Sequence, residues 1–164
     1  INVGFNVSLP LVMTSGTVAA AFEGSMWGIT SVAVSQAIPP QHFESVKMHN
    51  GQVTGELQEN LVCAAERAAQ FTLGIMDQTD QTSVVHNLNF PARVALDTPM
   101  ETTQLSNFSL GSLFAAEAQG VYRFAFPVHR KPVFTPEDSD VACLQRGHIS
   151  HTTIDYNHLG KHQI

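Results

Sequence analysis

The residues best suited to chemistry lie near the start of the chain. Ser15, Gly16 and Thr17 form a short turn directly before a run of strong helix formers. The first turn of a helix leaves backbone N–H groups without partners and carries a partial positive charge, so this turn is suited to hold an anion. The hydroxyls of Ser15 and Thr17 add donors, and Gly16 lets a ligand approach the backbone closely. A second interpretation stays open, in which Ser15 is only the N-cap of that helix.

A second polar group, Asn2, Gly4 and Asn6, precedes this turn. Asn side chains offer a neutral oxygen to hard cations such as Mg²⁺ or Mn²⁺, which ordinarily need at least one carboxylate as well. No Asp or Glu precedes Glu23 in the sequence. Asn and Gly are also common turn residues, so the pattern leaves a metal contact and a simple turn as alternatives.

Charge limits how an anion could be held and which partners are possible. Charged residues make up 13% of the chain, and 8 Lys and Arg against 14 Asp and Glu give a net charge of −6. This balance argues against binding to nucleic-acid polymers. Because no Lys or Arg precedes Lys47, a phosphate bound near the start of the chain would depend on backbone N–H groups or on a metal ion.

The weakly charged N-terminal stretch and the two cysteines bear on cellular location. Polar residues interrupt residues 1–41 too often for a membrane span of about 20 apolar residues, and the basic leading region typical of a signal peptide is missing. Cys63 and Cys143 show no metal-ligand spacing, so we expect core thiols in a reducing compartment and a cytoplasmic protein. A disulfide between them stays an alternative.

The candidate residues must be positioned by the helices and strands that follow them. Hydrophobic spacing, helix formers and short β-branched runs distinguish the two kinds of element. The expected elements are a loop at 7–13, a helix at 18–27, a strand at 30–35, a surface excursion at 36–55, a helix at 56–76 and a strand at 83–90. This order predicts an α/β sandwich with parallel strands.

The second half of the chain changes character near Ala92. Prolines and an acidic cluster separate short runs that we interpret as strands at 102–105, 120–126 and 141–154. We therefore expect two parts, an α/β core formed by residues 1–91 and a β-rich extension formed by residues 92–164. Prolines in such an extension favour an arm that exchanges between subunits, so we predict a dimer or a larger oligomer.

Several segments follow one another in an order that resembles a known family. The chain reads N-V-G-F-N at 2–6, S-G-T-V-A-A-A at 15–21, S-V-A-V-S at 31–35, N-L-N-F-P at 87–91, D-V-A at 140–142 and G-H-I-S at 147–150. This order resembles the SurE family of nucleotidases, whose patterns are S-G-I-N-x-G-x-N, Y-S-G-T-V-x-A-A-x-E-G, L-N-V-N-I-P and T-D-x-x-A-x-x-x-G-Y-V-S-I-T-P-L. The resemblance spans nearly the whole chain.

The resemblance implies a fold, an activity and a set of site residues. It implies the C-terminal part of a Rossmann-like three-layer core with a β-rich extension, in a homodimer or homotetramer. It also implies hydrolysis of nucleoside 5′/3′-monophosphates or related phosphomonoesters with Mg²⁺ or Mn²⁺. By this resemblance Asn6, Ser15 and Thr17 are catalytic, the same three residues and Gly16 contact the phosphate, and Asn2 contacts the metal.

The sequence departs from the family pattern at three places, one of which is a gap from Asn6 to Ser15 that is one residue longer than in the common bacterial pattern. The family's Asp-Asp-Gly segment and its metal-binding Ser are not in the given sequence, so these ligands are expected from a longer chain or another chain, or else this piece is inactive. Thr14 stands where the family has Tyr. The preferred phosphate ester therefore stays undetermined.

Two other function classes were weighed against a phosphomonoesterase. The first is a non-catalytic module that binds an anion or serves assembly after losing its metal site. The second, an oxidoreductase that binds a dinucleotide, is disfavoured because no G-x-G-x-x-G follows a strand.

The eight histidines do not form a recognisable metal motif. His148 and His151 are three residues apart in an expected strand, where such side chains face opposite ways. The remaining histidines are scattered, and each is expected to be a surface or packing residue. Those are His42, His49, His86, His129, His158 and His162.

Overall fold

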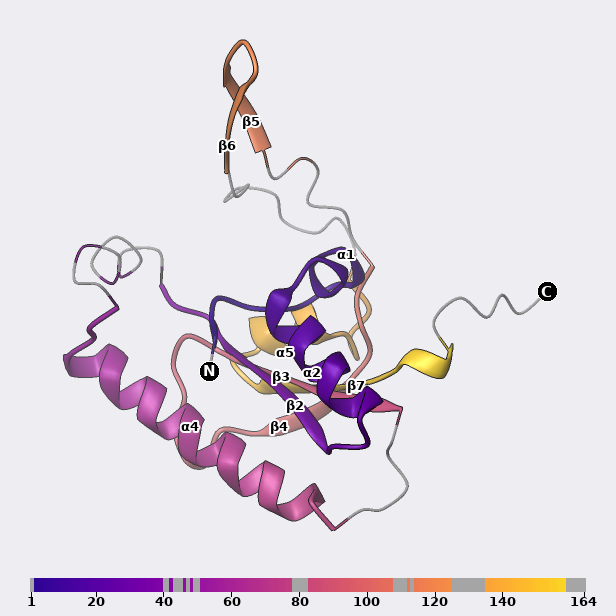
Figure 1. Cartoon of the computed structure of the whole chain (residues 1–164). Coiled ribbons are helices and arrows are strands. Elements are labelled where there is room, and N and C mark those ends of the chain that lie inside the picture. The colour runs from indigo at the N-terminus through magenta and orange to yellow at the C-terminus, as the bar shows by residue number, and fades with distance from the viewer. Residues whose placement is uncertain are drawn as a thin grey trace.

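A five-stranded sheet with helices on both faces forms the centre of the molecule (Figure 1). The structure, a computed structural model, describes residues 2–39, 42, 46, 48, 51–77, 83–107, 112, 114–124 and 135–158. The strand order is β1-β2-β3-β7-β4. The bounds are Asn2–Val3 for β1, Ser31–Gln36 for β2, Val84–Phe90 for β3, Ile149–Asp155 for β7 and Met100–Thr103 for β4. The expected α/β class with three layers is confirmed.

The strands of this sheet do not all run in one direction. β1, β2 and β3 are parallel, as expected for a layered α/β unit. β7 is antiparallel to β3 and parallel to β4. The prediction of parallel strands therefore holds for the first three strands, whereas the sheet as a whole is mixed.

Helix α2 (Gly16–Met26) covers one face of the sheet and packs against the short helix α1 (Leu9–Met13). Their apolar side chains meet those of the strands in one buried cluster, which comprises Val12, Val18, Ala21, Ala33, Val85 and Ile154. Near its end α2 approaches β2 closely, because a Cβ at Gly24 would lie 2.7 Å from the Ser31 Oγ. The helix predicted at 18–27 is confirmed, with its start two residues earlier.

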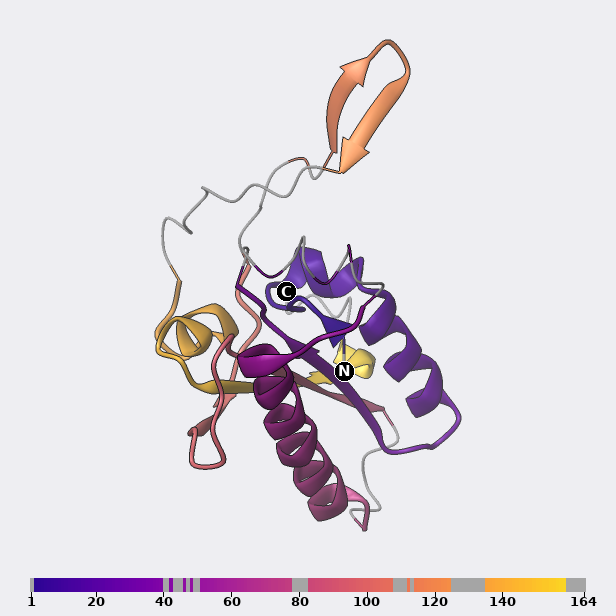
Figure 2. The same cartoon turned by 90° about the vertical axis from the view of Figure 1, so that its left-hand side faces the viewer.

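Helix α4 (Gly55–Ile75) covers the opposite face, and Figure 2 shows α2 and α4 on either side of β2. Buried small residues, Ala64 and Ala68, allow the helix to pack closely on Leu88, Phe90 and Ile149 of the sheet. Apolar residues at helical spacing predicted this element at 56–76, and the structure confirms it. No helix in the described parts of the chain is both long and apolar enough to cross a membrane.

Two predicted elements are wrong in part. A loop was expected at 7–13, but Leu9–Met13 form α1, because Pro10 lies in the first turn, where the missing N–H is not needed. A strand was expected at 141–154, but its first residues form helix α5 (Asp140–Gln145). The Ser139 side chain caps α5 by accepting a hydrogen bond from Ala142 N at 3.2 Å. The apolar residues after Ser139 led to the prediction of a strand, although Ser139 is a typical N-cap residue.

The division near Ala92 needs revision. β4 and β7 both come from residues 92–164, yet they belong to the central sheet. What stands apart from that sheet in both views is the hairpin of β5 (Phe114–Ala118) and β6 (Val121–Phe124) (Figure 1). It includes the described part of the strand predicted at 120–126. Residues 125–126 and part of the excursion predicted at 36–55 lie outside the described residues. The role of an oligomerisation arm stays a prediction.

Two histidines contact each other across β3 and β7. His86 Nδ1 and His151 Nε2 are 2.9 Å apart, with the edge of Phe71 from α4 against both rings. Burial lowers the pKa of His86, and burial together with the neighbouring His86 lowers the pKa of His151 to about 4. Both rings are therefore neutral at pH 7. Sequence analysis did not pair them, because their contact depends on the strand register.

This pair predicts that acid lowers the stability of the fold. The ordinary histidine pKa is 6.5, so between about pH 6.5 and pH 4 the unfolded chain binds more protons than the folded chain. The free energy of unfolding therefore decreases as the pH is lowered through this range. Replacing both rings (His86→Leu with His151→Ile) should flatten this part of the pH profile measured by urea unfolding.

His158, in the 3-10 helix Tyr156–His158, is paired with Asp155. The control is therefore His42→Gln, at a histidine whose side chain has no ion pair in the described parts of the structure, and it should keep the wild-type slope. An equally steep profile in the double variant would contradict the assignment.

Candidate functional site

The chain topology brings the predicted site residues to one edge of the sheet. β1 and β2 are parallel neighbours, so the chain between them must return to the start of β2, and α2 therefore begins near the carboxyl ends of these strands. Figure 1 shows this end of α2 beside α1. In open α/β sheets, ligands bind in the crevice outside the carboxyl ends of the strands.

The turn before α2 serves two purposes. Ser15 is the N-cap, since its Oγ accepts a hydrogen bond from Val18 N at 3.2 Å, and its own N–H donates to Val12 O at 3.2 Å. The N-cap interpretation of Ser15 is therefore confirmed. Within the described residues, the backbone N–H groups of Gly16 and Thr17 have no hydrogen-bond partner. A Cβ at Gly16 would meet nothing within 4 Å, so the approach to these donors is open.

Asn6 is held by three neighbouring side chains. Its N–H donates to Asn89 Oδ1 at 2.7 Å, and its carbonyl accepts from Asn87 Nδ2 at 2.8 Å and from Asn89 Nδ2 at 3.0 Å. Its own Nδ2 donates to Ser35 Oγ at 2.7 Å. Because a hydroxyl both donates and accepts, the contact to Ser35 is also satisfied with the Asn6 amide turned over. Asn6 can thus present either an oxygen or an N–H to a ligand.

A buried carboxylate holds the next part of the same segment. Asp140 is fully buried; its Oδ2 accepts from Ser8 N at 2.7 Å, and its Oδ1 accepts from Ser106 N at 2.9 Å and Val141 N at 2.8 Å. Ser8 has a φ of 64°, a left-handed conformation that is strained for a residue with a side chain. The hydrogen bond to Asp140 therefore stabilises the turn that follows Asn6.

Some buried polar atoms near this network have no hydrogen-bond partner in the described parts of the structure. They include both side-chain amide atoms of Gln36, at the carboxyl end of β2, and Asn87 Oδ1. An unpaired buried polar group costs about 1–3 kcal/mol. Within the described residues, these polar atoms at this edge of the sheet thus lack hydrogen-bond partners.

The metal site implied by the sequence resemblance does not fit these residues alone. Asn2 lies in β1, in register with Ser35, but no three His, Cys, Asp or Glu side chains among the described residues gather into a possible metal site. The oxygens of Asp140 are occupied by backbone N–H groups. One neutral oxygen from Asn6 is too weak a ligand set for Mg²⁺ or Mn²⁺, so we derive no step through a metal ion.

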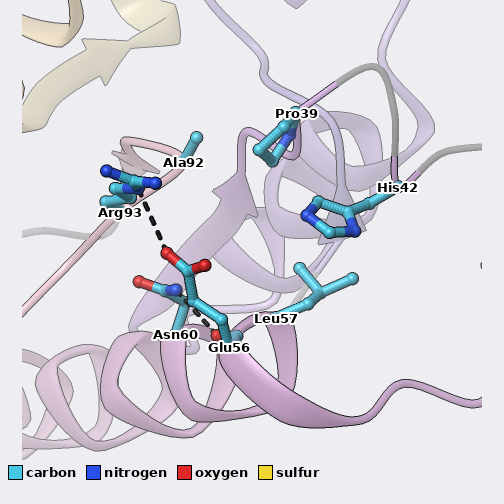
Figure 3. Close-up of a pocket in the computed structure, with 7 residues that line it drawn as sticks. All are labelled: Pro39, His42, Glu56, Leu57, Asn60, Ala92 and Arg93. Atoms are coloured by element: carbon cyan, nitrogen blue, oxygen red, sulfur yellow. Dashed lines mark hydrogen bonds and ion pairs between the residues drawn. The ribbon is translucent and has the colours of Figure 1, made fainter.

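A small hollow of about 40 Å³ lies at the start of α4 (Figure 3). Glu56 forms an exposed ion pair with Arg93, with 3.1 Å between Oε1 and Nε, and Asn60 Oδ1 accepts from Val94 N at 2.8 Å. The other residues that line it are Pro39, His42, Leu57 and Ala92. None of the residues predicted from the sequence lines this hollow.

A family model described as survival protein SurE matches residues 1–112 of the chain. The chain belongs to the SurE family. A 5′-nucleotidase SurE from Methanocaldococcus jannaschii is 30% identical over 156 residues, which cover 94% of this chain and 55% of the relative. A 5′-nucleotidase SurE from Thermofilum pendens is 27% identical over the same shares. The chain thus spans about half the length of these SurE relatives.

The fold agrees with a solved SurE structure. The crystal structure of SurE protein from Aquifex aeolicus matches with a TM-score of 0.58 and 19% identity, over 94% of this chain and 56% of that one. At this identity the likeness shows the fold, and the Rossmann-like α/β class is confirmed.

Part of this SurE site was not identified from the sequence. Asn87 and Asn89 appeared only as part of the resembling N-L-N-F-P segment, and Asp140 only as part of D-V-A. Their alternation along β3 was the available signal, because residues two apart in a strand share a face. Nothing in the sequence alone paired Asp140 with Ser8, which lies 132 positions away.

Asp140 should be essential to the stability of this edge. Asp140→Asn replaces one accepting oxygen with an NH₂ group that faces a backbone donor, so we expect the free energy of unfolding to fall by about 2 kcal/mol or more. The matched control is Asp138→Asn, since Asp138 is exposed, and it should change stability little. Urea unfolding measures both, and equal effects of the two substitutions would refute this role.

Proposed function

We propose that the protein containing this chain is a metal-dependent phosphomonoesterase that acts on nucleoside 5′/3′-monophosphates or related small phosphate esters. Membership of the SurE family and the printed names of the relatives support this proposal. The observation that carries it is the pair of unpartnered N–H groups of Gly16 and Thr17, at the first turn of α2 and within the described residues. This chain would supply the phosphate-facing part of the site.

In this proposal the chain binds the phosphate through neutral donors. The N–H groups of Gly16 and Thr17 donate to phosphate oxygens, and the Thr17 hydroxyl adds a third donor. The positive end of the α2 dipole favours the charge that develops during phosphoryl transfer. Ser15 acts by holding the turn, because its Oγ accepts the capping hydrogen bond. Asn6 orients the substrate with whichever side of its amide faces the ligand.

The metal dependence in this proposal rests on ligands that lie outside the described residues. Asn2 is the neutral ligand that the family resemblance implies for this chain.

A non-catalytic anion-binding or assembly module is the second candidate. The capping bond of Ser15 favours it, since a turn held in this way can bind an anion without any chemical step. Hydrolysis by the whole protein of AMP or p-nitrophenyl phosphate, with and without EDTA, separates the two. Turnover that EDTA abolishes supports the phosphomonoesterase, and phosphate binding without turnover supports the module.

The substitution Gly16→Ala tests the phosphate contact without disturbing the fold. A methyl group at this position meets no protein atom within 4 Å, and Ala is a better helix former than Gly, so stability should not fall. The methyl group would obstruct a phosphate at the N–H groups, so kcat/KM should fall at least tenfold. Gly74→Ala, at an equally open position in α4, is the matched control and should leave kcat/KM unchanged. Equal activity of the two variants would exclude this cradle.

We further propose that the protein forms a homodimer or homotetramer through the β5–β6 hairpin. Its side chains are strongly exposed for apolar groups, with Tyr122 at 67% and Phe114 at 60%. Tyr122→Asp should shift the mass measured by light scattering toward the monomer, whereas Glu117→Lys, also exposed on β5, should not. A monomeric wild-type protein would contradict this assembly.

A cytoplasmic location is proposed on chemical grounds. Cys63 and Cys143 are both free thiols, and Cys143 is fully buried. Burial raises the pKa of the Cys143 thiol to about 11, which keeps it unreactive. Cys63 is only half-buried, so the expectation of a core thiol is confirmed for Cys143 alone. Unpaired core thiols such as Cys143 are usual in reducing compartments. The disulfide alternative is excluded by the structure.

A further inference from the structure

The spacing of His86 and His151 equals that of two adjacent ligands of one metal ion. Their nearest nitrogens, Nδ1 of His86 and Nε2 of His151, are 2.9 Å apart. Imidazole nitrogens bind first-row metals at about 2.0–2.1 Å, so two ligands at a right angle lie about 2.9 Å apart and two tetrahedral ligands about 3.4 Å apart. The observed separation is that of a hydrogen bond between the rings, and it also equals the spacing of two ligands at a right angle, which Cu²⁺ and Ni²⁺ accept.

The strand register fixes this spacing. β3 and β7 are antiparallel, with Leu88 opposite His151 and Thr153 opposite His86. The two histidines are therefore diagonal neighbours on one face of the sheet, where such side chains are within reach of each other. This is the face covered by α4, opposite the one that carries Ser35 and Asn89.

The surroundings of the pair are apolar. Phe71 of α4 packs against both rings, and Leu88 and Ile149 belong to the same buried layer. The hydrogen bond between the rings satisfies one nitrogen of each. The two histidines are thus a polar contact within an otherwise apolar layer.

The chemical state of the rings suits metal binding. Burial lowers the pKa of both imidazoles, so both are neutral at pH 7, and the neutral ring is the form that binds a metal. His151 is only half-buried, whereas His86 is buried. No third His, Cys, Asp or Glu joins the pair within the described residues, so water is expected at the other coordination positions.

We propose that His86 and His151 form a binding site for one Cu²⁺ or Ni²⁺ ion, separate from the phosphate-facing edge. In the apo pair one ring donates its N–H to the other. On binding, that ring carries its proton on the remote nitrogen instead, so both lone pairs face the ion and no net proton is released. The ion thus replaces the shared hydrogen and links β3 to β7 beneath α4.

Titration of the whole protein, without a histidine tag, with CuCl₂ at pH 7 tests this site. We expect one Cu²⁺ whose electron paramagnetic resonance spectrum shows coupling to two nitrogens, distinct from any Cu²⁺ held by the carboxylate site of the proposed function. His86→Leu and His151→Ile should each weaken binding at least tenfold and remove the coupling to the second nitrogen. Each introduces an apolar side chain suited to the apolar surroundings of the pair, and circular dichroism and thermal unfolding check that the variants fold.

His158→Gln is the matched control, because His158 is an exposed histidine outside the pair. It should leave the affinity and the spectrum unchanged. The proposal is overturned if the wild-type protein binds no Cu²⁺, or if a folded His151→Ile variant binds with wild-type affinity. It is also overturned if the wild-type spectrum shows only one coordinated nitrogen. Phosphatase activity is not part of this readout, so the result is independent of the proposed function.

Discussion

The hydrogen bonds between the Asn6 backbone and the asparagines of β3 are the constraint on which the candidate site depends. Asn89 accepts from the Asn6 N–H and also donates to its carbonyl, so it takes the place of a neighbouring strand for one residue. Asp140 continues this attachment at Ser8, where the backbone is left-handed. Without these partners the chain after β1 would have buried polar groups and no reason to turn toward α1. The position of the α2 N-terminus follows from this attachment.

Strands β2 and β3 and the two longer helices could be predicted from the sequence, because their signals are local. The spacing of Leu57, Ala64 and Ala68 marks the buried face of α4, and the prolines after β2 and β3 mark where those strands end. The failures have two kinds of cause, one local and one tertiary. α5 is too short for its apolar spacing to differ from that of a strand, and its cap at Ser139 is the only clear signal. The direction of β7 is a tertiary property that no window of sequence contains.

The site divides in the same way between local and long-range information. The role of Ser15 as N-cap and the open N–H groups of Gly16 and Thr17 follow from a turn before a helix. The contacts of Asn6 with Ser35 and Asn89 join segments 29 and 83 positions apart, and they depend on the register of β2 with β3. The pair of His86 and His151 likewise depends on the register of β3 with β7, which explains why isolated histidines in the sequence are close neighbours in the fold.

Gly24 sets how closely α2 lies to the sheet. Any side chain there would collide with Ser31, since even a Cβ would be 2.7 Å from its hydroxyl oxygen, so helix and strand are in contact at one end while Val12 and Val18 pack together at the other. Because α2 is held at both ends, the N–H groups of its first turn keep a constant position relative to the sheet. An anion binding there would therefore lose little affinity to the ordering of a loop, and its selectivity would come from matching a rigid arrangement of dipoles.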